Sequence, residues 1–224
     1  MTDRENVFAN AQASRRSVFT LAAAALLATT MPRQKVANAQ SAGDAAAGPP
    51  IAQLDDALLA AMKAGRSVPF ADRYRALAPK VERSFDLEVI LATSVGVNWG
   101  TLPESQRTTL INIFRRYAIS SYVANFDTYN GETFQLLPAV RPVGNGNVLV
   151  QTKLLSTDGS SVAFDYVMHD GVEGWRAVDV LADGSISRVA TQRSDFRALL
   201  TSGGVQALAT GLERKVASLS GGVV

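Results

Sequence analysis

The chain has 224 residues, of which 47% are apolar, 19% charged and 7% aromatic, and this composition is too apolar for a disordered protein. Its formal net charge is +2, but residues 1–39 hold five of the 22 Lys and Arg and two of the 20 Asp and Glu, so 17 basic and 18 acidic residues remain beyond them. That balance predicts no polyanion-binding surface and hence no nucleic-acid partner. The lack of cysteine excludes thiol catalysis and Cys-ligated metals, and the single histidine, His169, argues against multi-histidine metal sites and a Ser–His–Asp triad.

Residues 1–39 have the pattern of a bacterial export signal. Arg15-Arg16 precede an uncharged Ala/Leu-rich run to Met31 that is too short for a membrane span of about 20 residues, and Ala37-Asn38-Ala39 offers a small-x-small cleavage site. The paired arginines are typical of the twin-arginine route, and an ordinary secretory signal is the alternative. We expect cleavage after Ala39 and a periplasmic protein.

Helical patterns follow a small, polar segment, residues 40–50, that we interpret as a flexible leader. Apolar residues at helical spacing predict a helix over residues 51–65. A second helical segment runs from Phe70 to Gly96, and Pro79 predicts its division into two helices.

A further helix is expected to begin near Thr101, with Thr101 as its cap and Glu104 closing a capping box. Its apolar stripe comprises Leu110, Ile113, Phe114, Tyr117, Ser121 and Tyr122. The chain ends in two helical stretches that Gly203-Gly204 separate.

Between these helical regions, residues 133–181 show alternating apolar and polar positions broken by turn signals. The clearest alternation places Val162, Phe164, Tyr166 and Met168 on one side, and the preceding strand does the same with Val148, Val150, Thr152 and Leu154. We therefore predict an α+β fold, in which a curled antiparallel four-stranded sheet packs with N- and C-terminal helices.

The sequence contains no phosphate loop, no G-x-S-x-G elbow and no H-E-x-x-H. Asp165, Asp179 and Asp183 are the carboxylates nearest the predicted sheet, and we interpret them, like His169, as solvated surface residues. A small enzyme with an Asp and a Tyr in a cone-shaped sheet remains an alternative.

Several ordered segments resemble the MlaC (toluene-tolerance, Ttg2D) family of periplasmic phospholipid-binding proteins, including its hopanoid-associated HpnM branch. The resemblance spans about residues 68–217, and the matching segments are Ser84-Phe85-Asp86, Gly96-Val97-Asn98-Trp99, Tyr129-Asn130-Gly131-Glu132, Gly174-Trp175-Arg176-Ala177-Val178-Asp179-Val180 and Gln192-Arg193-Ser194-Asp195-Phe196. The chain departs from the family at Ala182-Asp183-Gly184 and Val189-Ala190-Thr191, so the resemblance leaves both a phospholipid and a hopanoid open as the lipid.

This resemblance implies that residues 51–220 form an NTF2-like lipid-binding domain with no enzymatic activity and no cofactor other than its lipid cargo. Such a carrier holds the acyl tails of a phospholipid or hopanoid in an apolar pocket. It exchanges them with an inner-membrane ABC transporter complex and an outer-membrane lipoprotein complex.

Periodicity and resemblance together give the predicted lining of that pocket. The strand candidates are Val148, Val150, Leu154, Phe164, Tyr166, Met168 and Trp175, and the helix candidates are Leu87, Ile90, Leu91, Phe114 and Tyr117. We expect a hinge near Gly96 or Gly203-Gly204. Two rival interpretations stay open: an isomerase or hydratase that uses Asp179 or Asp165 with a tyrosine, and a ligand-free adaptor of an envelope transporter with a solid core.

Overall fold

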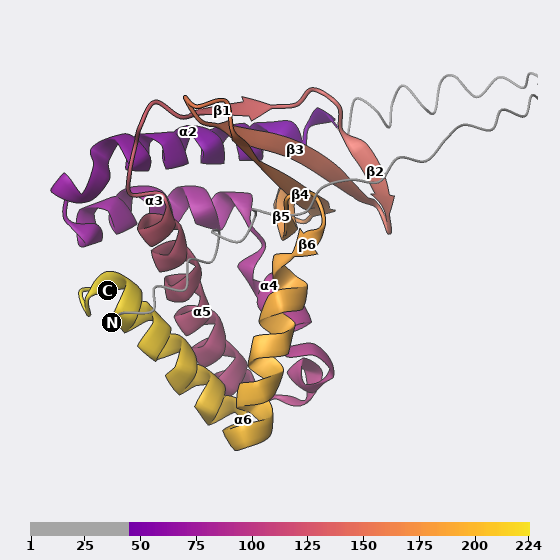
Figure 1. The fold of residues 1–224 in the computed structure, drawn as a ribbon. Helices are drawn as coiled ribbons and strands as arrows, with labels where there is room; N and C mark the ends of the chain where they lie inside the picture. Colours follow the sequence, from indigo (N-terminus) through magenta and orange to yellow (C-terminus); the bar gives the residue numbers. More distant parts are fainter. Residues whose placement is uncertain (1–44) are drawn as a thin grey trace, which may run out of the picture.

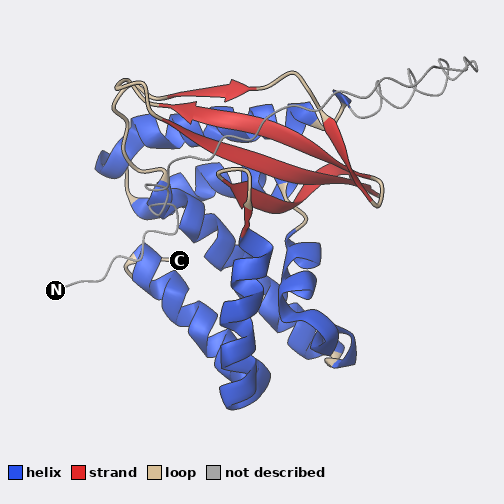
Figure 2. Ribbon diagram, turned by 45° about the vertical axis from the view of Figure 1, so that its right-hand side comes forward, coloured by secondary structure: helices blue, strands red, loops and turns tan. Residues whose placement is uncertain are grey.

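The computed structural model describes residues 45–224, so the predicted export signal and residues 40–44 of the leader lie outside the described part. Helices lie on one side of the molecule and an antiparallel sheet on the other, which confirms the α+β class (Figures 1 and 2). The elements are, in chain order, α2 (Gly48–Ala64), η1 (Gly65–Ser67), α3 (Phe70–Ser84), α4 (Leu87–Val95), η2 (Gly96–Thr101), α5 (Glu104–Asn125), β1 (Thr133–Leu136), β2 (Arg141–Gly144), β3 (Asn147–Leu155), β4 (Ser161–Gly171), β5 (Gly174–Ala182), β6 (Ile186–Ser187) and α6 (Arg188–Ser220).

The curled sheet has six strands rather than the four that we predicted. Its order is β1-β3-β4-β5-β6, with β2 also paired to β3, and all the pairs are antiparallel. The two additional strands are short. β2 forms inside the predicted turn region, where Pro142 lies opposite Val148 on an edge strand that tolerates its missing N–H, and β6 adds two residues beside β5.

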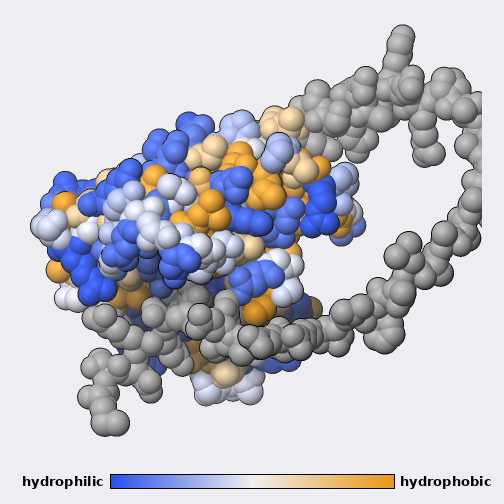
Figure 3. Space-filling model, turned by 45° about the horizontal axis from the view of Figure 1, so that its top comes forward, coloured by the Kyte–Doolittle hydropathy of each residue, from blue (hydrophilic) through white to orange (hydrophobic). Residues whose placement is uncertain are grey.

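The predicted alternation along the two long strands is correct for the protected face of the sheet. Val148, Val150 and Thr152 of β3 are buried, as are Phe164 and Tyr166 of β4. Figure 3 views the molecule from the sheet side, where apolar side chains are interspersed with hydrophilic ones. The apolar core therefore lies between the sheet and the helices.

Helix α3 does not end at Pro79, which lies inside it, so the predicted division there is wrong. The break falls at Phe85, whose backbone is extended and forms a parallel bridge with Ala177 of β5. Asp86 then starts α4, since its side chain accepts a hydrogen bond from the backbone N–H of Val89 at 3.1 Å. Pairing with the sheet, rather than proline, sets this boundary.

Two other helix starts also differ from prediction. Thr101 does not cap α5: its hydroxyl donates to the carbonyl of Asn98 at 2.8 Å, and Pro103 occupies the cap position without a side-chain hydrogen bond. Helix α2 begins at Gly48, three residues before the predicted start, with prolines in its first turn where their missing N–H groups leave no hydrogen bond unmade.

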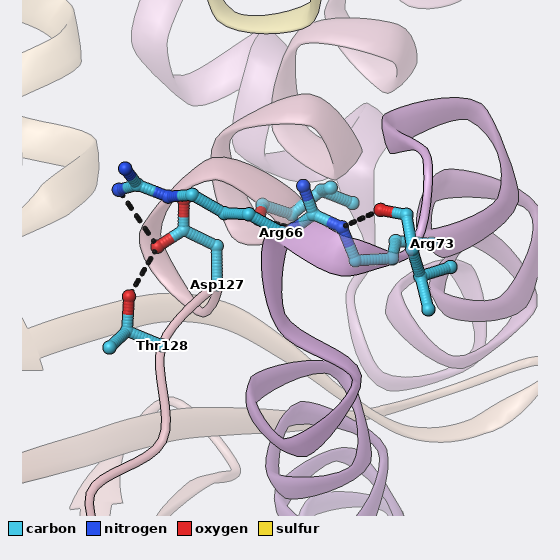
Figure 4. A network of polar contacts seen from close by, with 6 residues as sticks. Arg66, Arg73, Asp127 and Thr128 are labelled. Carbon is cyan, nitrogen blue, oxygen red and sulfur yellow. Dashed lines mark hydrogen bonds and ion pairs between the residues drawn. The ribbon is translucent and has the colours of Figure 1, made fainter.

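A polar network fixes the connection between α2 and α3 against the end of α5 (Figure 4). Arg66 donates to the Asp127 carboxylate at 2.7 Å, and the Thr128 hydroxyl donates to the same carboxylate at 3.0 Å. Buried Arg73 donates to the carbonyls of Val68 and Val123 at 3.1 and 2.9 Å. Burial works to raise the pKa of Asp127, but the hydrogen bonds from Arg66 and Thr128 outweigh it and hold that pKa below its ordinary value.

Candidate functional site

An apolar cavity of about 80 Å³ lies between the protected face of the sheet and helices α4, α5 and α6. It is partly open to solvent. Its lining residues are Phe85, Leu87, Ile90, Phe114, Tyr117, Ala118, Ser121, Tyr122, Phe126, Phe164, Tyr166, Asp179, Val180, Arg188, Val189 and Gln192. The arrangement therefore offers a hydrocarbon environment with a few polar groups.

Helix α5 supplies the longest stretch of this lining. Phe114, Tyr117, Ala118, Ser121 and Tyr122 fall at helical spacings i, i+3, i+4, i+7 and i+8, so they share one face. That face is the predicted stripe, and it points toward the sheet.

Aromatic rings form the inner wall of the cavity. The ring of Tyr122 lies 5.4 Å from that of Phe85 and stacks on Phe126 at 6.0 Å, measured between centroids. Phe85 also contacts Tyr166 at 6.1 Å, and Phe126 contacts Phe164 at 6.5 Å. These separations are typical of favourable aromatic pairs, so helix and strand rings form one continuous apolar surface.

The polar groups of the cavity gather where β5 meets the start of α6. Asp179 accepts hydrogen bonds from the Ser187 hydroxyl and from the backbone N–H of Val189 at 3.1 Å. Its carboxylate therefore stabilises the N-terminus of α6, where negative charge is favourable. Arg188 and Gln192 lie one turn apart on the same helix and complete the polar side.

A carboxyl group that the sequence analysis missed lies in the core near the two cavity tyrosines. Asp55 of α2 is 4% exposed, and neither of its carboxylate oxygens has a hydrogen-bond partner in the described part of the chain. Burial, with a smaller contribution from Asp56, raises its pKa to about 7. Burial likewise raises the pKa of Tyr122 and of Tyr166, and Asp55 adds to both shifts, so both hydroxyls stay protonated at neutral pH.

Six of the twelve predicted lining residues border the cavity, and six do not. Those that border it are Leu87, Ile90, Phe114, Tyr117, Phe164 and Tyr166. Leu91, Val148, Val150, Leu154, Met168 and Trp175 lie elsewhere, the first three and Met168 buried in the core and the other two packed against it at partial exposure. For Met168 the reason is length: at about 3.3 Å per strand residue, it lies roughly 13 Å along β4 from Phe164, although both share a face.

Ten lining residues were missing from the predicted set. Tyr122 and Ser121 stand on the predicted α5 stripe, and Ala118 and Phe126 continue its spacing, so the sequence carried a signal for them. Arg188, Val189 and Gln192 carried none, because only the three-dimensional path of α6 brings them to the sheet.

The carboxylates considered for an enzyme are engaged elsewhere. Asp165, predicted to be solvated, is 4% exposed and accepts a hydrogen bond from Gln151 Nε2 at 2.9 Å on the strand face opposite Tyr166. Asp179 borders the cavity but accepts hydrogen bonds from the Ser187 hydroxyl and the Val189 N–H at the start of α6. No group of three or more His, Asp or Glu within residues 45–224 is arranged to hold a metal. None of the helices in that range combines the length and the apolar composition that a membrane span needs.

Comparison with known proteins shows where this architecture belongs. Residues 52–214 match the family described as MlaC protein. Among solved structures, the chain is similar to a phospholipid-binding protein from Ralstonia solanacearum, in complex with a phospholipid, with a TM-score of 0.67 and 20% sequence identity over 78% of this chain and 98% of that one. The structural likeness confirms the fold, and the family match covers most of the chain. The chain therefore belongs to the MlaC family, as its sequence motifs predicted.

Proposed function

We propose that this protein is a periplasmic lipid carrier that covers the acyl chains of a phospholipid while they cross an aqueous space. The observation that carries the proposal is the cavity between the sheet and α4–α6, whose walls are mainly aromatic and aliphatic. Membership of the MlaC family and the phospholipid bound by the Ralstonia protein support it.

The energetics of an exposed acyl chain explain why such a protein is needed. Each methylene in water costs about 0.8 kcal/mol, so a chain of about 16 methylenes costs roughly 13 kcal/mol. A dry apolar wall removes most of that cost without any catalytic group. The engagement of Asp179 in hydrogen bonds with the start of α6 agrees with a binding role.

Lipid binding requires the cavity to widen. Ligand pockets usually span roughly 300–1,000 Å³, so a cavity of about 80 Å³ is too small for an acyl chain. Gly203 and Gly204 have non-helical backbone angles and divide α6 into two arms. The first arm carries Arg188, Val189 and Gln192, so its displacement about this kink would move one wall away from the sheet.

The polar side of the cavity suits the head group. Arg188 lines the cavity beside Gln192, and a guanidinium forms strong charge-assisted hydrogen bonds with phosphate. The apolar side faces the rings of α5 and β4. We therefore place the tails against the rings and the phosphate near α6.

The cargo can be identified by organic extraction of the purified protein followed by mass spectrometry. A stoichiometric phospholipid supports the proposal, and a hopanoid supports a carrier with the other cargo. No lipid but a tight complex with a membrane protein would instead identify a transporter adaptor, and turnover of a small substrate in an empty cavity would identify an enzyme.

A matched pair of substitutions tests the cavity itself. Ala118→Leu adds three carbons at the cavity wall, so we expect it to fold and carry several-fold less lipid than wild type. Ala76→Leu makes the same change on the exposed side of α3 and should carry the wild-type amount. Equal lipid content in the two folded variants would show that this cavity is not the lipid site.

The proposal includes export and transfer between membranes. The Arg15-Arg16 pair and the Ala/Leu-rich run support export by the twin-arginine route, with the mature protein exchanging lipid with an ABC transporter complex of the inner membrane and a lipoprotein complex of the outer membrane. Changing both arginines to lysine should retain the precursor in the cytoplasm, as measured by fractionation. Unchanged export of that variant would indicate the ordinary secretory route.

A further inference from the structure

A second hollow lies along the first arm of α6 and is lined by residues other than those of the lipid cavity. It measures about 380 Å³ and separates η2 from that arm. Its walls are Val95, Gly96, Val97 and Asn98 on one side and Arg193, Arg197, Leu200 and Thr201 on the other. We call it the η2–α6 cleft.

Two arginines on one helix face line this cleft. Arg193 and Arg197 are four residues apart, so their side chains lie one above the other on α6, and both are exposed. Neither forms an ion pair with an acidic group within residues 45–224. Asp195, which lies between them in sequence, is instead 3.9 Å from Lys215.

The opposite wall approaches the Arg193 side chain closely. Gly96 has a φ of +77°, and a β-carbon there would lie 3.5 Å from a guanidinium nitrogen of Arg193, which is ordinary van der Waals contact. Asn98 adds an amide, and Val97 is 88% exposed at the rim. The cleft thus combines two cations, a neutral donor and an apolar contact within the size of a small-ligand site.

We infer that the η2–α6 cleft binds a phosphate group, and that its source is a phospholipid head group at a membrane surface. Guanidinium groups bind phosphate through two parallel hydrogen bonds, which suits a pair of arginines facing one concavity. The exposed Val97 beside them favours a lipid surface, because apolar groups next to basic ones are typical of proteins that lie on membranes. This inference rests on the proposed function, since a carrier must approach the membranes that it serves.

The cleft also shares a wall with the lipid cavity. Gln192 lines the cavity, Arg193 lines the cleft, and the Ser94 hydroxyl of α4 donates to Gln192 Oε1 at 3.3 Å. A phosphate held by Arg193 and Arg197 therefore contacts the arm of α6 whose displacement would widen the cavity. Membrane contact and cavity opening act on one helix segment.

The test is co-sedimentation of the purified protein with vesicles of phosphatidylcholine containing 30% phosphatidylglycerol, a composition we choose for its negative charge. Each basic residue near an anionic surface contributes about 1 kcal/mol, so R193Q together with R197Q should weaken partitioning about 30-fold. The control R214Q changes an exposed arginine on the second arm of α6 and should weaken it by much less. Circular dichroism melts confirm that all the variants fold.

Two further measurements identify the ligand and distinguish this inference from the proposed function. Weak vesicle binding together with saturable binding of inorganic phosphate, lost in the double variant, would support a phosphate site filled by the free ion. Equal vesicle and phosphate binding by wild type and the double variant overturns the inference, and so does binding only to an acidic membrane protein. Extraction of the double variant should yield the wild-type amount of lipid, so failure of the cleft would leave the cavity proposal standing.

Discussion

Replacing Asp55 by asparagine should stabilise the protein progressively more as the pH rises from 5 to 8. The carboxyl is 4% exposed and has no hydrogen-bond partner in residues 45–224, and burial raises its pKa from 3.8 to about 7. The folded state therefore binds this proton more tightly than the unfolded state does. Stability contributed by the protonated group is fully present below pH 3.8 and is lost as the pH rises to 7.

The size of this effect follows from the shift in pKa. About three pKa units at 1.36 kcal/mol each amount to about 4 kcal/mol over the whole range. Of this, roughly 2.5 kcal/mol falls between pH 5 and pH 8 according to the same linkage relation. Asparagine does not titrate, so the difference in unfolding free energy between variant and wild type should grow by that amount.

Urea unfolding at both pH values, followed by tryptophan fluorescence, measures this difference. Asp56→Asn is the matched control, since Asp56 is the exposed neighbour on α2. This substitution should change the difference in unfolding free energy between pH 5 and pH 8 by less than about 1 kcal/mol. Parallel pH profiles for wild type and Asp55→Asn would refute the assignment of a charged, unpaired Asp55 at pH 8.

Three further changes test the frame around the site by thermal melting. Asp86→Ala should lower the free energy of unfolding by about 1–2 kcal/mol because it removes the cap of α4 and an ion pair with Arg176. The control Glu173→Ala, whose side chain is 72% exposed, should change it by no more than about 0.5 kcal/mol. Equal losses in the two variants would contradict this prediction. Gly204→Ala should lower the free energy of unfolding by about 1–2 kcal/mol because φ is +64° at that residue. The control Gly100→Ala should leave it unchanged, because Gly100 has open space around it and no positive φ. An unchanged stability of Gly204→Ala would mean that the kink straightens. Asp127→Asn should destabilise by about 1 kcal/mol at pH 7, and the difference should vanish as the pH falls through the lowered pKa of Asp127; persistence in acid would show that packing, not charge, is responsible.

The spacing of apolar residues along the chain predicted which faces of the helices and strands are buried. The α5 stripe that includes Phe114 and Tyr117, and the strand alternation of Phe164 and Tyr166, both face the core as expected. Asp55 also carried a readable signal, because it stands on the buried stripe of α2 between Leu54 and Leu58. The position of a polar residue among apolar ones at helical spacing predicts burial, whatever its charge.

Features that depend on contacts between distant segments could not be predicted in this way. The end of α3 is set by the pairing of Phe85 with Ala177, 92 positions further on in the chain, which overrides the local preference of Pro79. The short strand β6 likewise exists only because β5 lies beside it.

Whether the space beneath the sheet is a filled core or a lined cavity also depends on contacts between distant segments of the chain. Phe164 and Met168 are both apolar and share a strand face, yet only Phe164 borders the cavity, because α4, α5 and the first arm of α6 converge on the sheet over a short length of β4. Asp179 holds the N-terminus of that arm beside the sheet, and the arm ends at the kink formed by Gly203-Gly204. The first arm of α6, which bounds both the cavity and the η2–α6 cleft, is thus fixed at one end and kinked at the other. The lipid carrier proposed above requires that arm to move as a unit while the sheet and α5 keep their packing, because only then does the cavity widen enough to admit a tail.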